Sequence, residues 1–147
     1  MNRVRATIPG DPRGKERPRH TSGGHTYTPE KTREYEKLVK LEFLRQVGKA
    51  SPLEGPVEAD VTAYYRIPKS VSKKKREAML RGEVRPTGKP DLDNIAKAVL
   101  DSLNGIAYRD DAQVTELRIR KYYSEEPRVE LSILECESNG VSQEGGG

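Results

Sequence analysis

Carboxylate side chains are concentrated in the segment from residue 89 to residue 114, which reads KPDLDNIAKAVLDSLNGIAYRDDAQV. Two carboxylates about 4 Å apart repel each other by roughly 4 kcal/mol at an effective dielectric near 20, so several converging carboxylates need a positive partner. Magnesium prefers such oxygen ligands, and the segment contains no Cys or His that would favour zinc. The segment therefore predicts a magnesium site, at which a bound ion activates water to cut a phosphodiester bond. The acidic residues, with one neighbouring amide, are Asp91, Asp93, Asn94, Asp101, Asp110 and Asp111.

Calcium bound in an EF-hand loop does not fit this segment. A loop counted from Asp91 places Ala96 where the motif needs glycine and Ser102 where it needs the closing glutamate. An ordinary alternative remains open, in which Asp91 or Asp93 caps a helix and the remaining acids form a solvated helix face. Lys97 fits that alternative too, because it stands four residues from an aspartate on each side.

The segment contains one amphipathic helix, expected over about residues 92 to 104. At 100° per residue its apolar side chains share one face, and Asp93, Lys97 and Asp101 share the opposite face. Residues two apart on a helix do not face each other, so Asp91 must lie before the helix to share a site with Asp93. A short return through a turn at Gly105 is expected to bring the second acidic pair close to the first.

The elements that must position this segment follow from periodicity and turn signals. The order of strands and helices predicts a single α+β domain over residues 1–135, with a mixed β-sheet and helices packed on it. Residues 136–147 lack periodicity and are expected to be a disordered tail. A Gly- and Pro-rich cationic loop without regular structure is expected between the first strand and the first helix. The predicted strands are 3–8, 57–67, 114–123 and 128–134, the last two forming a hairpin, and the other predicted helices are 29–47 and a short one from a serine to Gly82.

Composition bounds the possible functions. Lys and Arg number 27 against 23 Asp and Glu, and a basic chain with an acidic pocket suggests a polyanion held around a cation site. Only 33% of residues are hydrophobic and there is no Trp, so a thin core makes oligomerisation plausible. A single Cys excludes an internal disulfide, and no apolar run suits a secretion signal or a membrane span. We therefore expect a cytoplasmic protein that does not interact with membranes.

The acidic segment resembles the signature of the RusA family of Holliday-junction resolvases, which occurs in phages and prophages. Upstream, KERPRH and YTPEKTREYE resemble the basic loop and first helix of that family, so the resemblance covers about residues 7 to 123. It implies a homodimer that uses Mg²⁺ and makes paired nicks in opposed strands of four-way junction DNA. Matched residue by residue, it implies that Asp91, Asp93 and Asp111 hold the metal and that these three and Lys97 are catalytic.

Contacts with DNA are predicted for basic residues of the cationic loop and for Lys89. Lys15, Arg17 and Arg19 in the cationic loop, together with Lys89, are expected to contact phosphates, and a solvated loop is the alternative. The run from Lys73 to Arg76 leaves DNA contact and a solvated helix face equally open. The resulting hypothesis is a Mg²⁺-dependent structure-selective endodeoxyribonuclease acting on Holliday junctions. The alternatives are a non-catalytic DNA-binding module and a metal-dependent enzyme acting on nucleotide or sugar phosphates.

Overall fold

A mixed four-stranded sheet forms the centre of the protein in the computed structural model, which describes residues 2–15, 19–20, 22–24, 26–27 and 29–136. The strands lie side by side in the order β1-β6-β4-β5, so the first and last strands of the chain are neighbours. β6 runs antiparallel to both β1 and β4, whereas β4 and β5 are parallel. The predicted mixed sheet is thus confirmed. The strands are β1 (Arg3–Pro9), β4 (Val57–Arg66), β5 (Val114–Ser124) and β6 (Arg128–Glu135).

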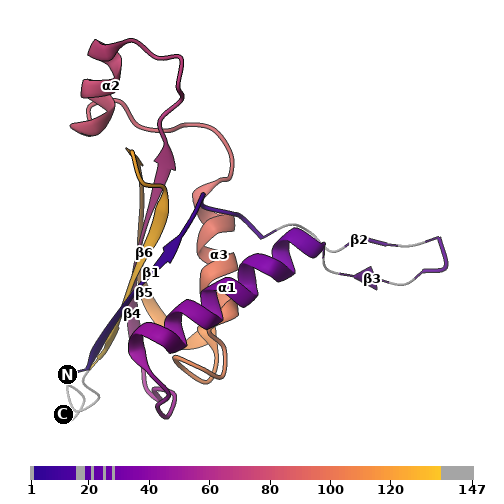
Figure 1. Cartoon of the computed structure of the whole chain (residues 1–147). Coiled ribbons are helices and arrows are strands. Elements are labelled where there is room, and N and C mark those ends of the chain that lie inside the picture. The colour runs from indigo at the N-terminus through magenta and orange to yellow at the C-terminus, as the bar shows by residue number, and fades with distance from the viewer. Residues whose placement is uncertain (1, 16–18, 21, 25, 28, 137–147) are drawn as a thin grey trace.

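Two helices cover one face of this sheet, as Figure 1 shows: α1 (Glu30–Val47) and α3 (Leu92–Ser102). α1 packs against β1 and α3, and α3 also contacts β5. The residues between the helices and the sheet form one hydrophobic core, so the α+β fold class is confirmed. Its largest fully buried side chains include Ile8, Val39, Val61, Ile95, Val99, Tyr108, Val129 and Ile133.

The alternation in β4 explains which of its side chains face the helices. Val57, Ala59, Val61 and Ala63 are buried on the helix side, as the period-two pattern predicts. Tyr64, on the opposite side, is only partly buried. One apolar face per strand is enough here, because the helices cover one side of the sheet.

The predicted hairpin between the last two strands is wrong. β5 pairs only with β4 within the described residues, and β6 lies between β1 and β4. Strands are about 4.8 Å apart, so the link between β5 and β6 must cross about 10 Å, which three extended residues can span at about 3.3 Å each. The short turn at residues 125–127 therefore steps over the end of β4 rather than joining neighbours. β5 is parallel to β4 because the chain between them crosses back through α3.

The cationic loop differs from its prediction as well. The Gly and Pro content predicts no regular structure there, yet β2 (Arg19–His20) and β3 (Thr26–Tyr27) pair as a small antiparallel ribbon. Figure 1 shows this ribbon extending away from the sheet beyond the start of α1. The expected tail, apart from Cys136, lies outside the described residues.

The short helix α2 (Lys73–Leu80) forms where the sequence predicts it. Ser72 caps it by accepting a hydrogen bond from the Lys75 backbone N–H at 3.2 Å, and the chain leaves it through Gly82 at a φ of 81°. α2 contacts β5 and lies beyond the end of the sheet where β4 finishes (Figure 1). No helix of the described residues is long and apolar enough to cross a membrane.

Candidate active site

The first turn of α3 presents two carboxylates to solvent. Asp91 occupies the N-cap position with an extended backbone, at φ −71° and ψ 153°, but its side chain makes no capping hydrogen bond. Asp93 follows in the first turn, and both residues are exposed. Neither carboxylate has a hydrogen bond or an ion pair with the described residues. The capping alternative is therefore not realised at Asp91, and both groups are available to a ligand.

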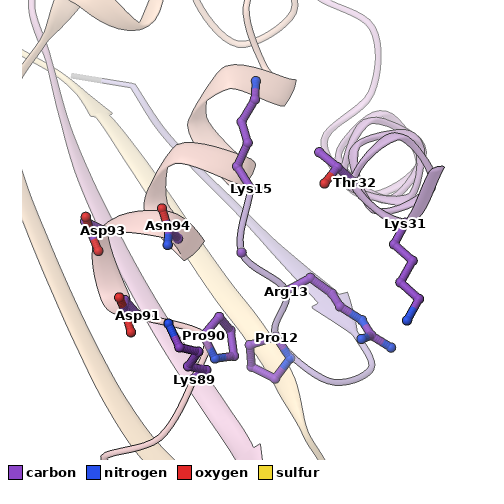
Figure 2. A pocket seen from close by; sticks show the side chains of 11 residues that line it. Pro12, Arg13, Lys15, Lys31, Thr32, Lys89, Pro90, Asp91, Asp93 and Asn94 are labelled. Carbon is purple, nitrogen blue, oxygen red and sulfur yellow. The ribbon is translucent and has the colours of Figure 1, made fainter. Parts of the chain in front are cut away.

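These two carboxylates line a pocket of about 650 Å³ together with several cationic side chains. The loop of residues 12–15 forms one wall, the first turn of α1 a second, and residues 89–94 the third. Figure 2 shows Asp91 and Asp93 on the same side of the α3 turn, with Pro12 and Pro90 between them and Arg13. A pocket with both signs of charge can hold a metal ion and the phosphate bound to it. Its cationic side chains that have no ion pair with the described residues are those of Arg13, Lys31 and Lys89.

The segment that leads into α3 is fastened to the sheet at three points. The Tyr65 hydroxyl donates to the Pro90 carbonyl, and the Lys121 ammonium donates to the Gly88 carbonyl at 2.8 Å. Arg85 donates from Nε to the Lys121 carbonyl at 3.0 Å. Burial, and then the charge of Asp91, raise the pKa of Tyr65 to about 12, so the hydroxyl remains a donor at neutral pH. These contacts fix the backbone on either side of Lys89 and immediately before Asp91.

Gly14 lies so close to Pro90 and to the first turn of α3 that a larger residue would require these neighbours to shift. A Cβ added there would be 2.9 Å from the Cβ of Asn94 and 3.0 Å from that of Pro90. The next residue, Lys15, donates its backbone N–H to the Asn94 carbonyl at 3.0 Å. The cationic loop is thereby held against the start of α3, beside the two free carboxylates.

Lys15 also bridges two helices through its side chain. Its Nζ lies 2.9 Å from Asp101 Oδ2 on α3 and 3.3 Å from Glu36 Oε2 on α1. Burial lowers the pKa of Lys15, but the hydrogen bond and charge of Asp101 outweigh it and raise the pKa overall. The sequence predicts that Lys15 contacts phosphate, and that role remains a prediction. The structure shows that its ammonium already has two carboxylate partners.

The two residues of the second acidic pair, Asp110 and Asp111, make different contacts. Asp110 caps the 3₁₀ turn η1 (Asp111–Gln113) by accepting from the Ala112 N–H at 2.8 Å, in a capping box with Gln113. Asp111 donates its backbone N–H to Asn104 Oδ1 at 2.7 Å, and its side chain hydrogen-bonds Asp101. This hydrogen bond is the main cause of the raised pKa of Asp111. Burial raises the pKa of Asp101, but its hydrogen bonds with Lys15 and Asp111 outweigh burial and lower the pKa overall.

Asp111 consequently lies beside the far end of α3 rather than beside its start. Asp101 follows Asp93 by eight residues, a rise of about 12 Å along the helix. Among the described residues, no three His, Cys, Asp or Glu side chains come together as a metal-binding group. The structure thus brings Asp91 and Asp93 together at one pocket and Asp111 to Asp101. A role for Asp111 at the metal stays a prediction.

Lys97 lies between these two acidic groups, one helical turn beyond Asp93. It is exposed and forms no ion pair within the part of the chain that the structure describes, so the alternative role of Lys97, a bridge between Asp93 and Asp101, is not realised there. Its charge lowers the pKa of Asp101 without contact at hydrogen-bonding distance. The ammonium is therefore free to interact with a ligand in front of α3.

Two cationic residues at this pocket, Arg13 and Lys31, were not predicted from the sequence as site residues. Arg13 belongs to the cationic loop that was identified, whereas Lys31 lies on α1 and only the folding of α1 against α3 brings it here. Of the predicted phosphate contacts, Lys89 is exposed at the pocket. Arg17 lies outside the described residues, and Arg19 is described only as part of β2.

Comparison with known proteins identifies the family. The family model described as Endodeoxyribonuclease RusA matches residues 9–134. The chain is 42% identical over 140 residues to the uncharacterized protein YqaN of Bacillus subtilis (strain 168), covering 92% of this chain and 98% of that protein. It is 32% identical over 81 residues to the crossover junction endodeoxyribonuclease rusA of Lactococcus phage r1t, covering 54% of this chain and 55% of that protein. The chain belongs to the RusA family, and the protein is accordingly an endodeoxyribonuclease, a hydrolase that acts on DNA.

Proposed function

We propose that this protein is a Mg²⁺-dependent, structure-selective endodeoxyribonuclease that resolves Holliday junctions by paired symmetrical nicks. The observation that carries the proposal is the pair of unpartnered carboxylates, Asp91 and Asp93, in a pocket whose cationic side chains suit phosphate. Membership of the RusA family and the name of the phage relative, a crossover junction endodeoxyribonuclease, support four-way junction DNA as the substrate.

The donor set of the pocket fits magnesium. Mg²⁺ takes oxygen ligands, keeps several of its waters, and is usually held by one or two carboxylates together with substrate phosphates. Asp91 and Asp93 supply two such carboxylates, and neither is used for capping or ion pairing within the described residues. We propose these two as ligands. Asp111 is the third proposed ligand, and it reaches the same ion only if its carboxyl group leaves Asp101.

The bound ion supplies a water nucleophile at neutral pH and stabilises negative charge on the phosphate that is attacked. The side chains of this protein bind and orient the DNA strand around it. Arg13, Lys31 and Lys89 face the pocket and bind the phosphates that flank the scissile bond. Lys97, one turn beyond Asp93, stabilises the charge that develops on the oxygens of the phosphate. The anchored segment before Asp91 keeps these groups in a fixed arrangement.

Paired nicks require two active sites, and each chain provides one such pocket. We therefore propose that a homodimer acts on the junction, with one pocket at each of the two opposed strands. The substrate is intracellular DNA, which makes the cytoplasm the proposed site of action.

A cleavage assay on matched substrates tests the proposal. A labelled four-way junction and a linear duplex of the same sequence are incubated with Mg²⁺ or with EDTA. We expect symmetrical nicks in two opposed strands of the junction, only with Mg²⁺, and little cutting of the duplex. A protein that binds the junction without cutting it would instead be a DNA-binding module, and equal cutting of both substrates would exclude structure selectivity.

The Asp93→Asn variant tests the assigned residues in the same assay. It should abolish cleavage and leave junction binding intact or tighter, because less negative charge then meets the phosphates. A variant that cuts at the normal rate would refute the assignment of Asp93.

A further inference from the structure

Besides the cationic loop, a second segment of the chain is strongly basic, and it ends at the pocket with Lys89. Residues 69–89 contain eight Lys and Arg against two Glu, a net charge of +6, whereas the whole chain has 27 Lys and Arg against 23 Asp and Glu, a net charge of +4. The remainder of the chain therefore carries a net charge of −2. The segment, and not the protein as a whole, has the electrostatic character of a polyanion-binding surface.

Three of its cations have partners within the protein. Arg76 pairs with Glu125 at 3.2 Å, and Arg81 pairs with Glu83 at 3.0 Å. Arg85 stacks over the ring of Tyr122, 4.2 Å from its centroid. The remaining five are exposed lysines that form no ion pair or hydrogen bond through the side chain within the described residues: Lys69, Lys73, Lys74, Lys75 and Lys89.

The run from Lys73 to Lys75 is not explained by helix stability. These three lysines fill the first turn of α2, where the helix dipole disfavours positive charge, and that turn contains no acidic residue. Lys73 stands four residues before Glu77, a spacing that permits an ion pair, yet no such pair forms. The lysines thus remain unpaired at a position where they cost helix stability, which favours a role in binding.

The helix that carries the lysines is capped and packed, and the segment after it is attached to β5 and continues to the pocket. Met79 is buried and anchors the last turn of α2, and Ser72 caps the start of the helix. Beyond the helix, Arg85 is fixed to β5 through Lys121 and Tyr122. Figure 1 shows α2 projecting past the end of the sheet, with the following segment running back to the start of α3. A strand of DNA in the pocket can therefore continue past Lys89 toward α2.

We propose that Lys73, Lys74 and Lys75 form a second DNA-binding surface, which holds the phosphate backbone of a duplex arm of the substrate away from the site of cleavage. The proposal rests on the proposed function in taking branched DNA as the substrate. Lysine ammonium groups act as point charges on phosphates, so the surface binds without sequence preference and sets affinity rather than the rate of the chemical step.

The test compares two triple variants with the same loss of charge. One carries Lys73→Gln, Lys74→Gln and Lys75→Gln. The matched control replaces three exposed lysines on and just after α1, which the structure places outside the pocket lining. Binding to a four-way junction built from synthetic oligonucleotides is measured in EDTA across about 50 to 200 mM salt. The control substitutions are Lys37→Gln, Lys40→Gln and Lys49→Gln.

The α2 variant should bind the junction at least tenfold more weakly at low salt. Its plot of log K against log salt should be shallower by up to about 2.7, since each phosphate contact contributes about 0.9. The control variant should keep the wild-type slope. When enough α2 variant is added to bind all of the junction, its single-turnover cleavage rate should match that of the wild type. Circular dichroism of both variants checks that the fold is retained.

Three results would overturn the inference: an unchanged slope in the α2 variant, an equal loss in both variants, or loss of binding to anionic lipid vesicles with DNA binding unaffected. If the slope differs between the wild type and the α2 variant but the wild type never cuts a junction, the proposed function would be contradicted. The inference that the three lysines bind DNA would still hold. The two failures are therefore distinguishable.

Discussion

Lys15→Met removes the cation that joins the cationic loop to both helices beside the pocket. The Lys15 Nζ lies 2.9 Å from Asp101 and 3.3 Å from Glu36, and at an effective dielectric near 20 each contact is worth about 5 kcal/mol before desolvation. The side chains are 29%, 22% and 22% exposed, so the net value lies between that of an exposed pair, about 0.2–1 kcal/mol, and that of a broken buried pair, about 3–5 kcal/mol. We expect the free energy of unfolding to fall by about 2 kcal/mol, which also reflects repulsion between the two carboxylates left behind.

Thermal unfolding and junction binding measure the two sides of this prediction. A chain of this size loses about 2–4 °C of Tm per kcal/mol, so the Tm should fall by about 4–8 °C at neutral pH. Lys15→Arg keeps the charge and should lose less. A double-mutant cycle with Asp101→Asn should give a coupling energy of about 1–2 kcal/mol. Cleavage should slow because the wall of the pocket is displaced, while the salt dependence of junction binding should be unchanged.

The opposite pattern would refute the reasoning. If Lys15→Met left the Tm unchanged but made the salt dependence of binding shallower by about 0.9, the ammonium would contact a phosphate and not act as an internal tie. A coupling energy near zero with Asp101→Asn would show that the pair at 2.9 Å contributes nothing to stability.

Two further changes test the framework around the site. Gly14→Ala should lower the free energy of unfolding by about 1–3 kcal/mol, because its Cβ would meet Asn94 and Pro90 at 2.9 and 3.0 Å, and it should slow cleavage more than it weakens binding. Wild-type Tm and cleavage in that variant would show that the close approach is not needed. Tyr108→Phe removes the hydroxyl that donates to the Leu100 carbonyl at 2.6 Å in the core. This carbonyl also accepts from the Leu103 backbone N–H at 3.2 Å, so thermal unfolding should show a loss of about 0.5–1.5 kcal/mol. An unchanged Tm would mean that the Leu103 N–H alone satisfies this carbonyl.

Elements that bury one face could be predicted from the sequence because periodicity along the chain encodes that burial. The alternation in β4 and the apolar stripe of α3 both predicted which side chains are buried. The partners of β5 and β6 could not be predicted, because a short turn fits both a hairpin and a step over one strand. The order of the strands depends on which side of β4 the chain returns to after α3, and β5 occupies one side and β6 the other.

The site shows the same division between local and tertiary information. The position of Asp91 just before the helix followed from the spacing of the DLDN motif, and the structure has it there. The partner of Asp111 depended on how tightly the turn after α3 closes, and the turn places it next to Asp101. The ion pair of Lys15 with Asp101 joins residues 86 positions apart, so no local pattern could reveal it.

Paramagnetic broadening by Mn²⁺ tests most directly whether Asp91 and Asp93 hold the metal ion. Amide spectra of the ¹⁵N-labelled protein are recorded with increasing Mn²⁺ for the wild type, Asp93→Asn and Asp110→Asn, the last serving as a control because Asn also caps helices well. We expect the amides of residues 91–94 to broaden first in the wild type and in Asp110→Asn, and this broadening to be lost in Asp93→Asn. Broadening near Asp101 that spares residues 91–94, or broadening that Asp93→Asn leaves unchanged, would contradict the proposed metal site.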